Sequence, residues 1–174
     1  FLLVSCGPSS DSPEYKIEQL TSQIKDEPEN PTLHYELGRV YIEDKKYHSA
    51  LKALNEAIRL QEDYGDAYRE KGIALFYLKK NFVAEKALKK SFALNPANAD
   101  IATDLGSISI ATGNPKKSLR FLKIAQIRDN NMHIVFNNLG AAHSEIGQNK
   151  QAIGYFEKAL EVHPLLTEVY INMG

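Results

Sequence analysis

Apolar residues recur at intervals of three and four along most of the chain, the pattern of amphipathic helices that pack on one face. In residues 133–166 this pattern predicts two helices separated by Gly147, which supplies turn chemistry between them. Similar pairs are predicted in residues 31–64, 65–98 and 99–132, and a single helix in residues 14–25. No proline interrupts residues 32–95. The sequence therefore predicts an all-α chain built from helix pairs.

These pairs are copies of one 34-residue unit. Five glycines are spaced by 34 residues: Gly38, Gly72, Gly106, Gly140 and Gly174. Sixteen positions after each of the first four stands a large apolar residue: Leu54, Leu88, Leu122 and Phe156. Because glycine inside a helix costs roughly 1 kcal/mol relative to alanine, its recurrence at one phase indicates a steric need. We expect the paired helices to approach closely there, with the large residue filling the gap.

This pattern resembles the tetratricopeptide repeat (TPR), and the resemblance covers residues 31–174. It implies a solenoid, a right-handed superhelix of antiparallel helix pairs, with repeats at 31–64, 65–98, 99–132 and 133–166 and a truncated fifth at 167–174. Residues 14–30 then form a capping helix, and residues 1–13 precede it. One departure concerns the residue before each glycine, which is large and apolar in four copies but is Lys71 in the second.

In TPR proteins the first helix of each repeat lines a concave groove that binds a protein or peptide. Carried over by repeat position, the resemblance implies these groove residues: Tyr35, Arg39, Arg69, Phe76, Tyr77, Asn137, Asn138 and Asn172. Asn138 and Asn172 hold a position at which many family members hydrogen-bond a peptide backbone, and a side-chain amide can both donate and accept. Alternatively, these asparagines only suit the repeat consensus.

Composition and charge narrow the function classes. The chain has 174 residues, 43% of them hydrophobic, which is typical of a globular protein. Its 21 Lys and Arg against 22 Asp and Glu leave a net charge of -1, so nothing in the overall charge favours nucleic acid as a partner. None of the five histidines stands in an HxxxH arrangement, and no glycine-rich phosphate loop is present. We therefore expect no enzyme activity, no metal and no cofactor.

The first residues suggest a membrane anchor. Leu3-Val4-Ser5-Cys6 resembles the bacterial lipobox, which implies that the chain is cleaved before Cys6 and lipidated on it. A polar segment rich in Pro and Ser follows and would serve as a tether. This predicts a lipoprotein of the bacterial envelope, at the outer membrane or in the periplasm. The alternative is a cytoplasmic adaptor whose Cys6 is an idle thiol.

At the other end, Val169, Tyr170 and Met173 would present an apolar face without a second helix to cover it. We expect either that the chain continues in a longer protein or that this end associates with another copy. The sequence thus predicts a non-enzymatic scaffold for protein interactions, assisting assembly or recruitment in the envelope. The alternative is the TPR region of a larger catalytic or signalling protein whose active domain follows Gly174. The partner, the pathway and the oligomeric state are left open.

Overall fold

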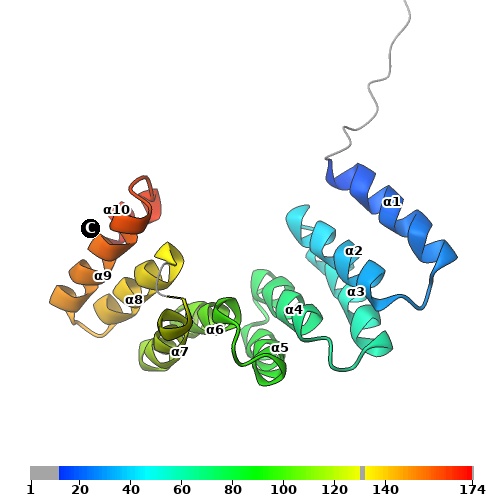
Figure 1. Cartoon of the computed structure of the whole chain (residues 1–174). Coiled ribbons are helices and arrows are strands. Elements are labelled where there is room, and N and C mark those ends of the chain that lie inside the picture. The colour runs from blue at the N-terminus through cyan, green and yellow to red at the C-terminus, as the bar shows by residue number, and fades with distance from the viewer. Residues whose placement is uncertain (1–11, 130–131, 174) are drawn as a thin grey trace, which may run out of the picture. The chain divides into compact units, whose positions relative to one another are not determined.

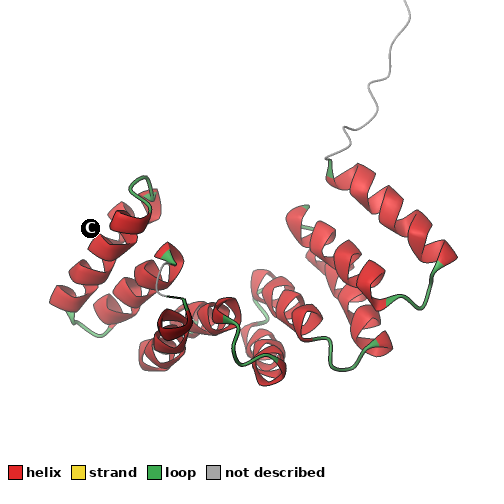
Figure 2. Cartoon of the chain, viewed as in Figure 1, coloured by secondary structure: helices red, strands yellow, loops and turns green. Residues whose placement is uncertain are grey.

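The computed structural model describes residues 12–129 and 132–173, and all regular structure in these ranges is helical (Figures 1 and 2). The helices are α1 (Pro13–Asp26), α2 (Pro31–Glu43), α3 (Tyr47–Leu60), α4 (Gly65–Tyr77), α5 (Asn81–Leu94), α6 (Ala99–Ala111), α7 (Pro115–Arg128), α8 (His133–Glu145), α9 (Asn149–Val162) and α10 (Thr167–Met173). The predicted all-α fold class is confirmed. Residues 1–11, including Cys6 and the segment that resembles a lipobox, lie outside the described residues.

The chain divides into two compact units, the first ending at Leu94 and the second beginning at Asn95. The first unit contains α1–α5 and the second contains α6–α10. The most extensive contacts join α2 to α3, α4 to α5, α6 to α7 and α8 to α9. We call α2, α4, α6, α8 and α10 the first helices, and α3, α5, α7 and α9 the second helices. In the first unit, α1 packs on α2.

Each helix pair is held together by the predicted contact between a glycine and a large residue. A Cβ atom added to Gly38 or Gly72 would lie 2.6 Å from Cγ of Leu54 or Leu88. The same atom on Gly106 would lie 2.5 Å from Cγ of Leu122. The opposing residues, which include Phe156 opposite Gly140, are almost completely buried. The expectation that glycine permits close approach of the paired helices is confirmed.

The turn inside each pair requires one residue with a positive φ angle. Lys45 and Lys79 have φ angles of 56° and 60°, and Gly113 and Gly147 have φ angles of 71° and 75°. These four residues are again spaced by 34. A left-handed conformation costs a non-glycine residue about 1–2 kcal/mol. The turns of the first unit therefore carry a strain that glycine avoids in the second unit.

Within each unit the first helices contact one another, α2 with α4 and α6 with α8. The second helices instead pack on the first helix of the following pair, as α3 does on α4 and α7 does on α8. They make no contact of that extent with one another in the described residues. Each unit is therefore narrower on the side of its first helices, and we call the exposed side of these helices the first-helix face. None of the helices between residues 12 and 173 that the structure describes is both long and apolar enough to span a bilayer.

Replacing Gly106 with alanine should destabilise the second unit. The new methyl group would collide with the buried Leu122, and such overpacking typically costs 1–3 kcal/mol, which exceeds the roughly 1 kcal/mol gain in helix propensity. Gly154 in α9 has no neighbouring atom within 4 Å of an added Cβ, so Gly154→Ala is a matched control that should raise stability. Denaturant unfolding followed by circular dichroism measures both; equal midpoints for the two variants would contradict this account.

Candidate functional site

On the first-helix face of the first unit, Tyr35 of α2 is the centre of a half-buried cluster. Its ring lies against Tyr64, with ring centroids 5.0 Å apart, and the Arg39 guanidinium lies 5.8 Å from its centroid. Arg39 Nη1 donates to Glu36 Oε2 at 3.2 Å, one turn earlier on the same helix. The structure thus brings together the predicted Tyr35 and Arg39, and adds Tyr64 and Glu36 to them.

The electrostatic environment of this cluster is acidic. Burial, together with the Glu70 carboxylate, raises the pKa of Tyr35 to about 12. Asp66 and Glu36 raise the pKa further, and only Arg39 among the named neighbours lowers it. Because a negative charge on Tyr35 is disfavoured here, the phenol remains a neutral hydrogen-bond donor throughout the physiological pH range.

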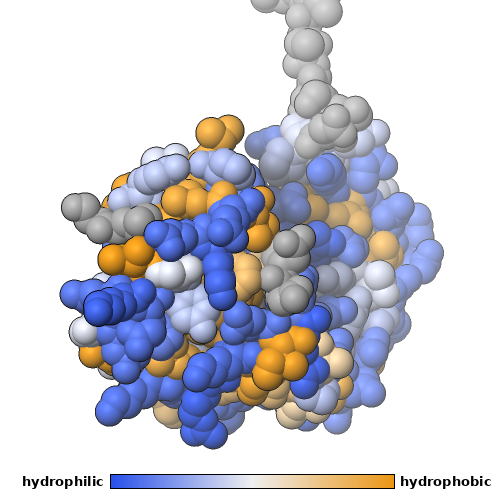
Figure 3. Space-filling model, turned by 60° about the vertical axis from the view of Figure 1, so that its left-hand side comes forward, coloured by the Kyte–Doolittle hydropathy of each residue, from blue (hydrophilic) through white to orange (hydrophobic). Residues whose placement is uncertain are grey.

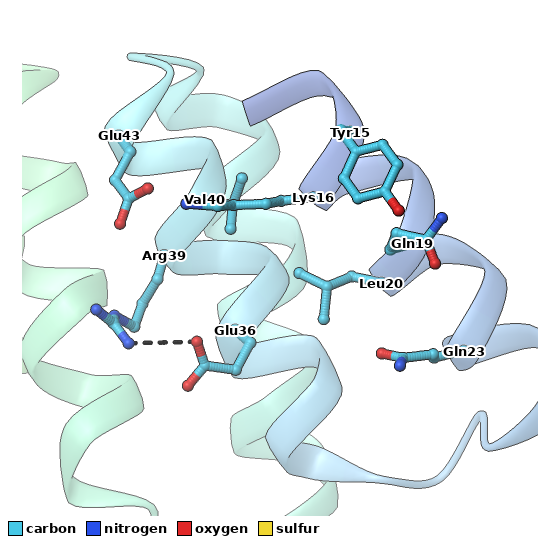
Figure 4. A pocket seen from close by; sticks show the side chains of 9 residues that line it. All are labelled: Tyr15, Lys16, Gln19, Leu20, Gln23, Glu36, Arg39, Val40 and Glu43. Carbon is cyan, nitrogen blue, oxygen red and sulfur yellow. Dashed lines mark hydrogen bonds and ion pairs between the residues drawn. The ribbon is translucent and has the colours of Figure 1, made fainter. Parts of the chain in front are cut away.

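A cavity of about 430 Å³ lies between α1 and α2, at the edge of the first-helix face (Figure 4). It is lined by Tyr15, Lys16, Gln19, Leu20 and Gln23 of α1 and by Glu36, Arg39, Val40 and Glu43 of α2. Leu20 extends from α1 toward α2 over the apolar part of the cavity, while the Glu36–Arg39 pair lies at its side (Figure 4).

Three more predicted groove residues lie on α4. Tyr77 is 54% exposed and stacks on Tyr47 of α3, with centroids 4.8 Å apart and planes 7° from parallel. Phe76 is half-buried and lies 6.1 Å from the Tyr77 ring. Arg69 is half-buried, with its guanidinium 4.0 Å from the Glu70 carboxylate. Of the two aromatic residues Phe76 and Tyr77, Tyr77 is therefore the one that a ligand can reach more easily.

The predicted asparagines lie on the first helices of the second unit. Two of them donate a side-chain hydrogen bond to the first helix of the repeat before. Asn138 Nδ2 of α8 donates to Ser107 Oγ of α6 at 2.8 Å. Asn172 Nδ2 of α10 donates to Asn137 Oδ1 of α8 at 3.0 Å. Asn137 is only 8% exposed. We call these two bonds the amide ladder; each joins a first helix to the first helix before it.

The charges on the first-helix face are mostly negative. The first helices α2 and α4 of the first unit carry four carboxylates and two arginines (Glu36, Glu43, Asp66, Glu70, Arg39 and Arg69), besides Lys71, which lines a cavity beside α5. The first helices of the second unit carry four carboxylates and no Lys or Arg: Asp100, Asp104, Glu145 and Glu168. The second helix α7 shows the opposite composition, with five basic residues and no acidic one. In the second unit, the first helices are therefore acidic and the second helix α7 is basic, although the net charge of the chain is only -1.

The histidines form no recognisable reaction centre. His143 is buried, with Nδ1 2.6 Å from Gln148 Oε1 and its ring stacked 5.3 Å from Tyr155. The rings of His133 and His163 lie 5.1 Å apart, at the start of α8 and just after α9. Across the described ranges, no three or more His, Cys, Asp or Glu side chains are grouped so that they could hold a metal ion.

Several residues that contact the predicted groove residues or line the cavity were not identified from the sequence. Tyr64 and Tyr47 contact the predicted aromatics from neighbouring segments, and Gln19 and Gln23 line the cavity beside α2. The two glutamines are four residues apart on one helix, so their spacing alone predicts that they lie on the same face of that helix. The contact of Tyr47 with Tyr77 depends on how one repeat stacks on the next, which spacing within a repeat does not specify. Tyr35 and Tyr64 belong to the same repeat, but they lie at its two ends, and their spacing does not indicate that they meet.

At the C-terminal end, apolar side chains reach the surface, but the face predicted from Val169, Tyr170 and Met173 is only partly uncovered: the prediction was wrong for Val169, which packs inward. Leu165 is 84% and Ile171 73% exposed, and Tyr170 is exposed as well. Val169 is fully buried, so α10 is docked through one side only. Figure 3, in which hydrophobic residues are orange, shows apolar surface in separate patches among polar residues on the side that it presents.

The repeated helix pairs define a class of protein, and comparison with known proteins agrees with it. Two family models described as "Tetratricopeptide repeat" match residues 10–81 and 135–163. The chain contains tetratricopeptide repeats, and the solenoid fold class predicted from the sequence is confirmed.

Solved structures share this fold. MamA from Desulfovibrio magneticus RS-1 superposes with a TM-score of 0.80 at 22% identity, covering 90% of this chain and 88% of that one. YrrB, described as a TPR protein with an unusual peptide-binding site, gives a TM-score of 0.76 at 19% identity over 94% and 84%. PilF of Pseudomonas aeruginosa gives 0.78 at 16% identity over 91% and 72%. At these identities the likeness concerns the fold alone.

Curated relatives are longer. RNA polymerase II-associated protein 3 from Homo sapiens is 30% identical over 102 residues, which are 59% of this chain and 15% of that protein. The Rattus norvegicus protein is 29% identical over 153 residues, 84% of this chain and 23% of its own length. The chain thus spans less than a quarter of the curated relatives that it matches.

Spectrophotometric pH titration should detect the environment of Tyr35. The pKa of about 12, against about 10 for a free tyrosine, means that the folded protein keeps this proton between pH 10 and 12 while the unfolded chain loses it. Stability from this group is complete below pH 10 and is lost as the pH rises through 12. The tyrosinate absorbance should show a component near pH 12 that Tyr35→Phe removes and Tyr15→Phe retains. A Tyr35→Phe titration identical to wild type would show this assignment to be wrong.

Proposed function

We propose that the chain is a non-catalytic scaffold whose first-helix face binds an extended segment of a protein partner. The segment carries basic side chains that face the carboxylates of this face, and apolar side chains that contact Tyr35, Phe76 and Tyr77. TPR proteins serve in general as platforms for protein or peptide partners, and the proposal adds the chemistry of the partner for this chain.

The observation that carries the proposal is the separation of charge. The first helices carry eight carboxylates against two arginines and Lys71, although the whole chain is close to neutral. A partner of opposite charge associates faster with such a surface, and a partner of like charge is repelled by it. Acidic tails are disfavoured for the same reason.

The aromatic residues and the cavity between α1 and α2 supply contact area that is not selective for charge. Exposed aromatic side chains dominate the energy of many protein interfaces because they bury a large area at low entropic cost. Tyr77 is already held by Tyr47, so little freedom is lost when a partner covers it. The cavity has room for one side chain of the partner beside Leu20 and Val40.

A labelled peptide of alternating Lys and Tyr tests this proposal by fluorescence anisotropy. We expect it to bind with an affinity that falls as salt rises, and we expect the matching Glu–Tyr peptide not to bind. Glu43→Gln combined with Asp66→Asn, both exposed on the first-helix face, should weaken binding roughly threefold to tenfold.

The matched control is Glu157→Gln combined with Glu161→Gln, two exposed carboxylates of the second helix α9. This double variant removes the same number of negative charges, but from a second helix rather than from the first-helix face. Equal weakening by both double variants would mean that net charge alone attracts the peptide, and the proposal would fail.

We further propose that the chain is an envelope lipoprotein, held at the membrane through Cys6 and assisting assembly or recruitment there. The support is the segment Leu3-Val4-Ser5-Cys6 at the start of the chain and the polar residues between it and α1. Each CH₂ group of an acyl chain that enters a bilayer adds about 0.8 kcal/mol, so two or more acyl chains would anchor the protein firmly.

Labelling with radioactive palmitate, in a bacterial host that expresses the complete reading frame, tests this assignment. Wild type and the control Ser5→Ala should incorporate label and sediment with membranes, whereas Cys6→Ala should do neither, since Cys6 is the sole cysteine. An unlabelled, soluble wild-type protein would refute the anchor and favour a cytoplasmic adaptor.

A second candidate function is that of the TPR region of a larger catalytic or signalling protein. The observation that favours it is the length of the curated relatives, of which this chain matches 15–23%. The complete open reading frame decides between the scaffold and this second function. A kinase, peptidase or other module beyond Gly174 would favour the second, in which the repeats recruit substrates for that module.

A further inference from the structure

A second cavity, of about 380 Å³, lies between α4 and α5 of the first unit. It is lined by Tyr68, Lys71, Val83, Lys86, Ala87 and Lys90. Three of these six residues are lysines, and none is acidic. The first-helix face uses other positions of α4, so this cavity is separate from the proposed groove.

Lys71 occupies a repeat position that is large and apolar in the other copies: Leu37, Leu105, Leu139 and Met173. The residue is half-buried, and the loss of hydration lowers the pKa of its amine. No ion pair or hydrogen bond holds this amine anywhere in the part of the chain that the structure describes. Burying a charged group without a partner is costly, so a lysine here reduces stability unless it contacts a ligand.

The other repeats lack this combination of residues. At the position of Ala87 the third and fourth repeats carry Phe121 and Tyr155, and a ring there would occupy the space of the cavity. The first repeat has alanine at this position, but Leu37 and Glu56 replace the equivalents of Lys71 and Lys90. Among the four repeats, this combination of a small residue with three lysines therefore occurs in the second.

The surroundings of the cavity favour an anion attached to an apolar group. The Lys90 amine lies 6.0 Å from the centroid of the Tyr68 ring, and Val83 is 46% exposed beside it. The carboxylate of Glu85 on α5 is paired with Lys89 at 2.7 Å. Glu62 and Asp63 line the adjoining cavity, which shares Tyr68 and Lys90, and they repel an anion placed on that side.

We propose that this lysine pocket, formed by Lys71, Lys86 and Lys90, binds a phosphate monoester carried by an aromatic or apolar group. Lysine amines bind phosphate as point charges, and three of them can balance a dianion. The Tyr68 ring and Val83 then contact the apolar carrier. The carrier is either a small molecule or a phosphorylated side chain of a partner, since both present the same chemistry.

Isothermal titration calorimetry of the whole chain with phenyl phosphate tests the pocket. Wild type should bind the probe, and Lys71→Met should weaken binding about tenfold or more, because charge-assisted contacts to phosphate are lost. Lys71→Met restores the apolar residue of the other repeats, so its unfolding midpoint should equal or exceed that of wild type. Lys123→Met, an exposed lysine on α7, is the matched control and should leave binding unchanged.

A second variant separates a shaped pocket from general attraction by positive charge. Ala87→Phe keeps all three lysines but fills the cavity, and it should abolish binding of phenyl phosphate. A Gly-phosphotyrosine-Gly peptide distinguishes the two carriers: binding equal to that of phenyl phosphate supports a phosphorylated partner, and weaker binding supports a small molecule. The proposal is overturned if wild type does not bind phenyl phosphate, or if Lys71→Met or Ala87→Phe binds it as wild type does.

Discussion

The contact between a helical glycine and one large buried residue determines how closely the two helices of every pair approach. Gly38, Gly72, Gly106 and Gly140 each face the residue sixteen positions later, at distances that leave no room for a methyl group. Because the same contact recurs four times, the pairs share one geometry, and within each unit the first helices lie side by side. The first-helix face of each unit is a consequence of this constraint, since side chains from the two copies become neighbours only when the copies are alike.

Contacts that repeat within a copy could be predicted from the sequence. The spacing of the glycines and of Leu54, Leu88, Leu122 and Phe156 was sufficient to place the close approach of the helices, and the structure confirms it. The turn position could also be read where glycine occupies it, at Gly113 and Gly147. It could not be read at Lys45 and Lys79, because the backbone conformation there is imposed by the helices on either side rather than by the residue's own preference.

Contacts between copies could not be predicted in the same way. Asn138 and Asn172 were identified as groove residues from their repeat position, but their hydrogen bonds go to Ser107 and Asn137, which vary from copy to copy. Two contacts within single copies were also missed, because they do not recur from copy to copy. Tyr64, the last residue of the repeat 31–64, contacts Tyr35 of the same repeat. Lys71 departs visibly from the consensus, but the cavity that it lines also depends on Ala87 and Lys90, which lie on the other helix of the same pair.

The amide ladder has a thermodynamic consequence for any partner that reaches the second unit. The amide nitrogens of Asn138 and Asn172 already donate to protein oxygens, so a peptide carbonyl that took either of them would exchange one hydrogen bond for another. Such an exchange contributes little enthalpy, and it leaves Ser107 Oγ or Asn137 Oδ1 without its donor unless the peptide or water replaces it. A segment that satisfies both partners of the broken bond would therefore bind more strongly than one that satisfies only one of them.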